Sequence, residues 1–169
     1  MNQNKIFIKN SIKLSPKDSP YNIGIDIKAI SMEIIGEKVN GFYRSIDYIQ
    51  YDTGIHLDSL KKNSEELIYT LVYPRSSVSK KNLLLCNSVG LVDPNYRDSI
   101  KLRFKYIYQP KDIRPFNDFF LFELDEDKIY NIGDKIGQLV FCKTIQAQFE
   151  YVPELMPSDR IGGFGSTGE

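Results

Sequence analysis

The sequence predicts an all-β domain, built as an antiparallel sandwich or barrel of many short strands. Short runs rich in Ile, Val, Phe and Tyr recur along the chain, and clusters of Gly, Pro, Asn, Asp and Ser separate them, which is the pattern of strands joined by turns. Residues 99–108 also alternate apolar side chains with Lys101, Arg103 and Lys105. This period-two alternation is typical of a strand with one buried face.

The individual elements follow from the same pattern. The clearest strands are expected at residues 5–8, 23–29, 67–73, 82–86, 99–108, 119–124 and 138–142. One short helix at most is expected, within residues 76–84, with Ser76 or Ser77 as its N-cap because a hydroxyl oxygen can accept a hydrogen bond from the first turn. Residues 108–130 contain two prolines and a Phe-rich middle, which favours an extended hairpin or arm.

Length and charge limit the possible functions. The chain has 169 residues, which suits one domain, and its 22 basic side chains balance its 22 acidic ones. A protein that coats nucleic acid or an anionic membrane usually carries an excess of Lys and Arg, so we expect neither as a direct partner. No segment approaches the ~20 apolar residues of a membrane span, and the first residues do not resemble a signal peptide. We expect a soluble intracellular protein, in the cytoplasm or nucleus of a cell or an infected host.

The scarcity of histidine and cysteine limits the chemistry. Cys86 and Cys142 are far apart and His56 is the sole histidine, so we expect no structural zinc site and interpret both cysteines as buried thiols. A mechanism that needs a histidine base is equally doubtful. Any catalysis should therefore use carboxylates, water or a metal ion.

Several polar residues stand at strand ends or turns, where they could carry chemistry. Arg75 lies beside two hydroxyls and could clamp phosphate oxygens, although a surface ion pair would explain it as well. Asp93 precedes a Pro-Asn turn, so it could be a rigidly held base or simply a turn-initiating residue. Asp26 could support a metal ion or bond a neighbouring loop. Asp134 and Lys135 are expected to form a solvated turn.

Five clusters occur in a fixed order along the chain. They are Gly-Ile-Asp-Ile-Lys-Ala at 24–29, Tyr-Pro-Arg-Ser-Ser at 73–77, Asn-Ser-Val-Gly-Leu-Val-Asp-Pro-Asn-Tyr-Arg at 87–97, Gly-Asp-Lys-Ile-Gly-Gln at 133–138, and Ile-Gly-Gly-Phe-Gly-Ser-Thr-Gly-Glu at 161–169. Together they resemble the five motifs of the trimeric dUTP nucleotidohydrolases (dUTPases), over essentially the whole chain. The resemblance implies a jelly-roll-like antiparallel β-barrel and a homotrimer with shared active sites.

The resemblance also implies a reaction. dUTP would be hydrolysed to dUMP and pyrophosphate by Mg²⁺-assisted attack of water on the α-phosphorus, which keeps uracil out of DNA and supplies dUMP for dTMP synthesis. Asp93 would activate the water and Gln138 would hold that water or a phosphate oxygen. Asp26 would support Mg²⁺ through water.

The substrate contacts implied by the resemblance divide by chemical group. Arg75, Ser76 and Ser77 would contact the triphosphate. Asn87 and the backbone of Leu91 and Val92 would bind uracil, and the ring of Tyr96 would exclude a 2′-hydroxyl. A lid at the end of the chain would add the remaining contacts, from Arg160, Phe164, Gly165, Ser166 and Thr167.

The family pattern divides the chain into a β-domain at 1–158 and a Gly-rich flexible lid at 159–169. Residues 108–130 look like an insertion by position, and a protein partner is expected there. Two departures from the pattern matter. Asp98 replaces a usual Gly, so the backbone there must avoid a positive φ. Arg160 stands one residue closer to Phe164 than is typical, which weakens its assignment to the γ-phosphate.

Two alternatives stay open at this point. The chain could be a dUTPase-like regulatory or binding module, since a fold alone does not establish activity. The related dCTP deaminases share the fold and an Arg-Ser-Ser, but they carry a proton-shuttling Glu on the strand where this chain has Ile-Lys-Leu-Arg at 100–103. The deaminase is therefore the less favoured alternative.

Overall fold

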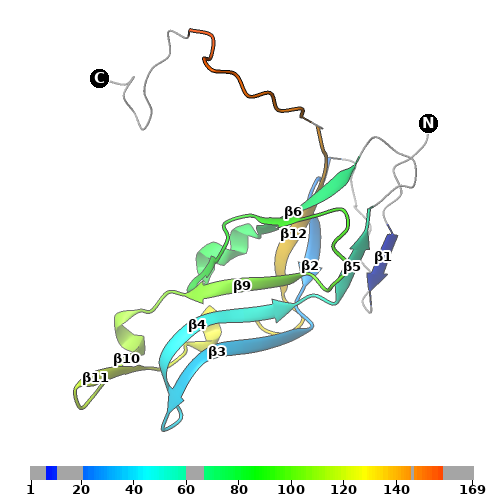
Figure 1. Ribbon diagram of the computed structural model, residues 1–169. Coiled ribbons are helices and arrows are strands. Elements are labelled where there is room, and N and C mark those ends of the chain that lie inside the picture. Colours follow the sequence, from blue (N-terminus) through cyan, green and yellow to red (C-terminus); the bar gives the residue numbers. More distant parts are fainter. Residues whose placement is uncertain (1–6, 11–20, 60–66, 146, 158–169) are drawn as a thin grey trace.

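The computed structural model describes residues 7–10, 21–59, 67–145 and 147–157. In these residues the secondary structure is nearly all strand, with short 3₁₀ turns, which confirms the all-β class (Figure 1). The strands are β1 (Phe7–Asn10), β2 (Ile25–Lys28), β3 (Ser31–Val39), β4 (Phe42–Asp52), β5 (Ile55–Asp58), β6 (Ile68–Pro74), β7 (Leu83–Leu85), β8 (Gly90–Val92), β9 (Lys101–Tyr106), β10 (Ile113–Phe116), β11 (Phe119–Phe122) and β12 (Lys135–Lys143). The 3₁₀ turns are η1 (Ser76–Lys80), η2 (Pro110–Asp112) and η3 (Glu126–Lys128).

The described strands form three antiparallel sheets: a small one that pairs β1 with β5, and two larger ones that enclose most of the core. Of the two larger sheets, the first has the strand order β2-β12-β6-β8, and the second has the order β10-β11-β4-β9-β7 with β3 added to β4. Buried Ile27, Val72 and Leu139 from the first sheet join the same core cluster as Ile49 and Phe104 from the second. The two sheets approach closely at Gly137 of β12. A Cβ added there would lie only 2.8 Å from Leu102 Cδ2 of β9. The core therefore lies between β12 and β9, and the strand ends around it can carry functional residues.

Tyr51 of β4 ties the core to the loop before β12. Its hydroxyl donates to the carbonyl of Tyr130 over 3.1 Å and accepts from the backbone N–H of Tyr130 over 3.2 Å. The rings of Tyr51, Phe104 and Tyr130 meet edge to face, with centroids 5.8 to 6.1 Å apart. These contacts fix the position of Tyr130 at the edge of the core.

The hairpin of β3 and β4 is the largest element that the strand pattern did not single out. Its turn is Asn40-Gly41, with φ values of 51° and 85°, which suits the tight turns that favour a right-handed strand twist. Much of β3 is exposed, so its side chains lack the alternation by which strands were recognised. The Asn-Gly pair was the available signal.

The segment at 76–84 differs from expectation at its cap. It is a single 3₁₀ stretch, Ser76–Lys80, whose N-cap position is Arg75, without a side-chain hydrogen bond. The expectation that Ser76 or Ser77 caps a helix is therefore wrong. Both serines lie inside the turn, because the chain leaves β6 directly into it.

The hairpin and the Asp98 backbone agree with expectation, whereas the two cysteines do not. Residues 108–130 do form a hairpin, β10 and β11, with 3₁₀ turns on either side. Asp98 has no positive φ, as its replacement of glycine required. Cys86 is exposed and Cys142 is half-buried, so the interpretation of both as buried thiols is wrong.

Among the described residues, no helix has the length and apolar character needed to cross a membrane.

Candidate active site

Asp26 and Gln138 are neighbours on one face of the first sheet. Gln138 of β12 is in register with Asp26 of β2 and with Tyr73 of β6. Its amide nitrogen Nε2 donates to Oδ1 of Asp26 over 3.3 Å. The next residue, Leu139, is in register with Val72 and buried in the core. Because side chains alternate along a strand, Asp26 and Gln138 lie on the face opposite to Val72.

Two cations approach the carboxylate of Asp26. Nζ of Lys135 lies 2.8 Å from Oδ2, and Nε of Arg75 lies 3.0 Å from Oδ1. The Arg75 Nε is buried and is not aligned for a hydrogen bond, so that contact is electrostatic. Burial opposes ionisation of Asp26, but hydrogen bonds from Lys135 and Gln138 and the charge of Arg75 outweigh it and hold the pKa of Asp26 below its ordinary value.

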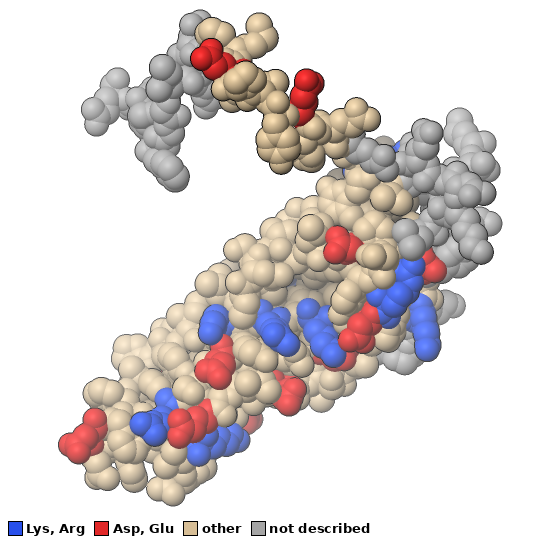
Figure 2. All heavy atoms as spheres, viewed as in Figure 1, with Lys and Arg blue, Asp and Glu red and all other residues tan. Residues whose placement is uncertain are grey.

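A basic pocket of about 450 Å³ lies beside this cluster. Four of its lining side chains are cationic and one is a carboxylate. The lining residues are Lys28, Arg75, Ser77, Lys81, Tyr130, Gly133, Asp134 and Lys135. This concentration of positive charge suits a phosphate-bearing ligand. Elsewhere, Figure 2 shows Lys and Arg side chains interleaved with Asp and Glu over the visible face, consistent with a balanced total charge.

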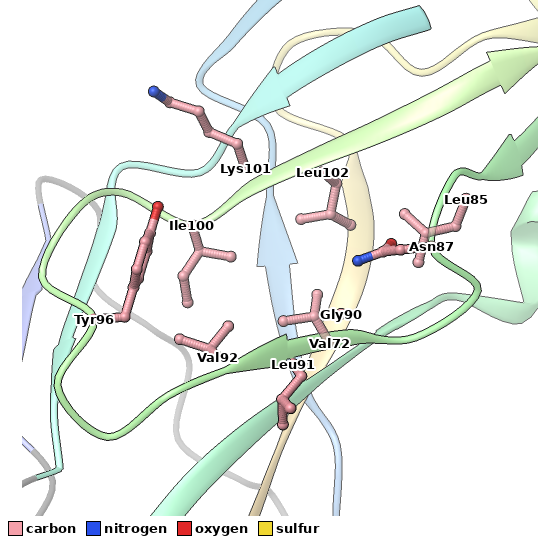
Figure 3. Close-up of a pocket in the computed structure, with 10 residues that line it drawn as sticks. All are labelled: Val72, Leu85, Asn87, Gly90, Leu91, Val92, Tyr96, Ile100, Lys101 and Leu102. Atoms are coloured by element: carbon pink, nitrogen blue, oxygen red, sulfur yellow. The ribbon is translucent and has the colours of Figure 1, made fainter.

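A second pocket of about 240 Å³ lies between β8 and β9, and most of the residues that line it are apolar, so we call it the apolar pocket. Figure 3 shows the amide of Asn87 directed into it and the ring of Tyr96 on the opposite side. The lining residues are Val72, Leu85, Asn87, Gly90, Leu91, Val92, Tyr96, Ile100, Lys101 and Leu102. The side chain of Leu91 points away from the pocket and is 64% exposed, so its backbone forms the wall. One amide among apolar side chains suits a small planar polar ring.

The loop after β8 is held by Arg97. The guanidinium Nη1 of Arg97 donates to the carbonyl of Pro94 over 2.8 Å, and Nη2 pairs with Asp58 Oδ1 over 2.8 Å. Nδ1 of His56 donates to the carbonyl of Arg97 over 2.9 Å. The Asp93 carbonyl accepts from Tyr96 N–H over 3.1 Å, which closes the turn between these two residues. Asp93 therefore stands on a braced turn.

The structure brings the expected site residues into two groups. Asn87, Leu91, Val92 and Tyr96 line the apolar pocket. Arg75 and Ser77 line the basic pocket, and Asp26 with Gln138 is joined to it through Arg75 and Lys135.

The remaining expected site residues either line neither pocket or lie outside the residues that the structure describes. Ser76 is exposed in η1, and its carbonyl accepts from Ser79 Oγ over 2.8 Å. Asp93 is exposed immediately after β8 and lines neither pocket. The expected lid residues, Arg160, Phe164, Gly165, Ser166 and Thr167, lie outside the described residues.

Some residues of the basic pocket were missed or misread from the sequence. Lys135 is exposed, but it begins β12 instead of lying in a turn, and it pairs with Asp26. Asp134 lies in the turn as expected, where its Oδ2 accepts from Asn131 N–H over 2.8 Å, but it is half-buried. Lys28, Lys81 and Tyr130 were not singled out. Lys28 lies two residues beyond Asp26 on the same strand, which was the available signal. Lys81, just after η1, and Tyr130, after η3, come from separate parts of the chain that the fold brings to one pocket.

Comparison with known proteins supports the expected family resemblance. No protein-family model matches the chain. A deoxyuridine 5′-triphosphate nucleotidohydrolase from Legionella pneumophila is 37% identical over 100 residues, which are 58% of this chain and 55% of that protein. One from Histophilus somni is 35% identical over 101 residues, 59% of this chain and 56% of that protein. The chain thus spans little more than half the length of the curated relatives that it matches.

Similarity to solved structures establishes the fold of the chain. The Staphylococcus bacteriophage 80alpha dUTPase with dUPNHPP has a TM-score of 0.69 and 19% identity, and the similarity covers 98% of this chain and 99% of that one. This chain has the dUTPase fold. A D95N mutant dUTPase of phage phi11 has a TM-score of 0.60 at 18% identity, covers 89% of this chain and 98% of that one, and is described as coordinating a structural Mg(II) ion. The jelly-roll-like barrel expected from the motifs, and the resemblance to dUTPases, are confirmed.

The residues at the dUTPase-fold site allow only a limited role in metal binding. Among the described residues, no cluster of three or more His, Cys, Asp or Glu could hold a metal ion. Asp26 offers one carboxylate, 27% exposed, with the amide of Gln138 beside it. Oxygen donors of this kind suit Mg²⁺, which keeps several waters and relies on substrate phosphates. The site therefore fits Mg²⁺ brought with a polyphosphate and contacted through water.

Proposed function

We propose that this protein is a dUTP diphosphatase, which hydrolyses dUTP to dUMP and pyrophosphate. The observation that carries the proposal is the apolar pocket, where four residues expected from the motifs meet in a dUTPase fold. Asn87 would pair with the uracil edge, while the backbone at Leu91 and Val92 would complete that contact. Tyr96 would lie against the deoxyribose and leave no room for a 2′-hydroxyl.

The triphosphate would occupy the basic pocket. Arg75 and Ser77 line it, Ser76 precedes Ser77 in the same turn, and all three would contact phosphate oxygens. Asp26 would support Mg²⁺ through water, and when bound the ion would neutralise charge on the phosphates. Lys28, Lys81 and Lys135 add positive charge around the same space.

The chemical step would use Asp93 as the base. Its carboxylate would accept a proton from a water molecule as that water attacks the α-phosphorus. The turn at Asp93 is braced by Arg97, which favours a fixed position for the carboxylate. Gln138 cannot act as a base but can orient water or a phosphate oxygen through its amide. The result would keep uracil out of DNA and supply dUMP for dTMP synthesis.

A complete site would require other copies of the chain, as in a homotrimer. In one chain, Val72 of the apolar pocket faces the core while Asp26 and Gln138 lie on the opposite face of the same sheet. The two pockets share no lining residue among those described. A base and its phosphates would therefore contact different subunits, and the lid at 159–169, with Arg160 and Phe164 to Thr167, would close from a third.

The segment before the lid supports the same assembly. Residues 147–157 extend away from the sheets (Figure 1). Phe149 is 88% exposed, Tyr151 fully exposed and Leu155 87% exposed. Several large apolar side chains left in water on one short segment usually mark an interaction surface, and a second copy of the chain would cover them.

The hairpin at 108–130 would bind a protein partner. Phe120 is 59% exposed, and the rings of Phe116 and Phe119 lie 5.3 Å apart beside the turn at Asn117. Exposed aromatic side chains are common anchors of protein interfaces. We place the partner there as a role additional to hydrolysis. That the hairpin is an insertion is part of this proposal.

The rival deaminase function is disfavoured by β9. Arg103 stands where that reaction would need a proton-shuttling acid, and its Nε donates to Gln50 over 2.9 Å while its guanidinium lies 4.5 Å from the Tyr48 ring centroid. An arginine held this way does not transfer protons at neutral pH.

The experiment that tests the proposal is a product assay. Purified protein with Mg²⁺ should release pyrophosphate and dUMP from dUTP, much faster than it hydrolyses UTP, dTTP or dCTP. Equal rates with all four nucleotides would contradict the specific pocket. Ammonia from dCTP would instead support a deaminase, and binding of dUTP without hydrolysis would support a regulatory module.

A further inference from the structure

Tyr130 places a hydroxyl in the basic pocket that the proposed mechanism does not use. Its side chain is 3% exposed, and its ring packs against Tyr51 and Phe104 in the core. The Tyr51 hydroxyl bonds both backbone groups of Tyr130, so the ring has little freedom to move. The Tyr130 hydroxyl therefore occupies a fixed position between the core and the pocket.

That hydroxyl has no hydrogen-bond partner among the described residues. A buried polar group without a partner is destabilising, and native proteins usually satisfy such groups. Nε of Arg75, which lines the same pocket, is also buried without a hydrogen bond. The Tyr130 hydroxyl without a hydrogen bond and the Arg75 Nε with only its ion pair to Asp26 lie in a pocket lined by four cationic side chains. This arrangement favours completion of the pocket by an anion.

Ser77 is the neighbouring hydroxyl on the pocket wall. Burial raises the pKa of Tyr130, while the side-chain hydroxyl of Ser77 and the charge of Arg75 oppose the rise, so the phenol stays neutral and keeps its proton to donate. The Ser77 hydroxyl is thus close enough to act on the Tyr130 oxygen, but without ligand the two do not meet the geometry of a hydrogen bond. The Tyr130 oxygen itself is shielded from solvent, whereas Ser77 is only half-buried. A ligand in the pocket would thus meet Ser77 first, with Tyr130 behind it.

We propose that Tyr130 is a positioning residue that acts through Ser77, donating a hydrogen bond to Ser77 Oγ when a polyphosphate occupies the basic pocket. A serine hydroxyl has one proton. Once its oxygen accepts from Tyr130, that proton is directed to a phosphate oxygen, and the two hydrogen bonds strengthen each other. The inference rests on the proposed function for the identity of its ligand, the polyphosphate of a nucleotide.

The test is a double-mutant cycle on the full chain. Binding of inorganic tripolyphosphate, with Mg²⁺ present, is measured by calorimetry for the native protein, Tyr130→Phe, Ser77→Ala and the double variant. Tyr130→Phe should weaken binding about tenfold, as expected for the loss of support to a hydrogen bond with a charged group. The double variant should bind no more weakly than Ser77→Ala, because Tyr130 acts only through Ser77.

A matched control separates this role from a structural one. Tyr108 is half-buried, its hydroxyl accepts from Ile46 N–H over 2.9 Å, and it does not line the basic pocket. Tyr108→Phe should lower Tm and leave tripolyphosphate binding unchanged. Tyr130→Phe should lower Tm less than Tyr108→Phe does, because the hydroxyl removed makes no well-formed hydrogen bond in the free protein.

Each contrary outcome overturns the inference. These outcomes are no binding of tripolyphosphate by the native protein, unchanged affinity in Tyr130→Phe, additive losses in the double variant, or a Tm loss in Tyr130→Phe equal to that of Tyr108→Phe. Hydrolysis of dUTP is measured separately. A native protein that hydrolyses dUTP but shows additive losses rejects the role of Tyr130 alone, whereas coupled losses in a protein that leaves dUTP intact reject the proposed function alone.

Discussion

Asp26 on β2 pairs with Arg75, the residue after β6, across the intervening strand β12, with 3.0 Å between Oδ1 and Nε. Lys135 at the start of β12 approaches the other carboxylate oxygen over 2.8 Å. One carboxylate thus holds two cations at the rim of the basic pocket. Its negative charge offsets only part of theirs, so the pocket remains positive before a ligand enters.

The first prediction concerns the pH dependence of stability. The pKa of Asp26 is lower in the folded protein than its ordinary value, so ionisation of this group favours the folded state. That contribution is present above the ordinary Asp pKa of about 3.9 and is lost as the pH falls through the lowered folded pKa. Asp26→Asn should therefore be less stable by about 1 kcal/mol at neutral pH, because the pair is partly exposed.

Chemical denaturation at several pH values provides the measurement. The difference in the free energy of unfolding between native protein and Asp26→Asn should be constant from about pH 5 to 7 and shrink below about pH 4. A difference that does not change with pH would show that the charge of Asp26 does not stabilise the fold.

The second prediction concerns Gly24. A Cβ added there would lie 2.7 Å from Oε1 of Gln138. Because that oxygen is the end of a flexible side chain, Gly24→Ala should displace Gln138 from Asp26 while the fold persists. We expect kcat for dUTP to fall about tenfold, with a smaller change in KM, as for a misplaced orienting group.

A second variant identifies the cause. Gln138→Ala should lose a similar factor, and the double variant should be no slower than Gln138→Ala. Independent losses in the two variants would mean that Gly24 acts on something other than Gln138.

The motifs predicted the apolar pocket better than the basic one. Asn87, Val92 and Tyr96 come from one continuous stretch of chain, so a local pattern was sufficient to group them. The basic pocket combines two stretches, 75–81 and 130–135, which meet because β6 pairs with β12, and no local pattern encodes that pairing. The expectation that Ser76 caps a helix was wrong because the 3₁₀ turn begins directly at the end of β6. Ser76 is therefore already inside the turn, and Arg75 occupies the N-cap position.

The third prediction uses two truncations to separate the lid from the assembly. A chain ending at residue 157 keeps the exposed apolar segment 147–157 and lacks the proposed lid. It should remain a trimer by light scattering and lose most dUTP turnover. A chain ending at residue 144 also lacks the exposed side chains of Phe149, Tyr151 and Leu155, which are the proposed intersubunit contacts, and it should dissociate.

The two truncated chains can contradict the proposals separately. Full turnover by the chain that ends at residue 157 would exclude a lid role for Arg160 and Phe164. A native protein that is monomeric and active would contradict the shared site.

The most direct test of the central claim compares Asp93→Asn with Asp98→Asn. Both carboxylates lie on the loop after β8, but the Asp98 carboxylate accepts from Ser99 N–H over 2.7 Å, a role that an amide oxygen can fill. Its other oxygen lies 4.0 Å from Nζ of Lys101, and an exposed ion pair of this kind contributes little. Pyrophosphate release from Mg·dUTP is measured for both variants and the native protein. The account predicts a loss of about 10²–10⁴-fold in Asp93→Asn, with near-native rates in Asp98→Asn. Equal rates in Asp93→Asn and native protein, or no release by the native protein, would contradict it.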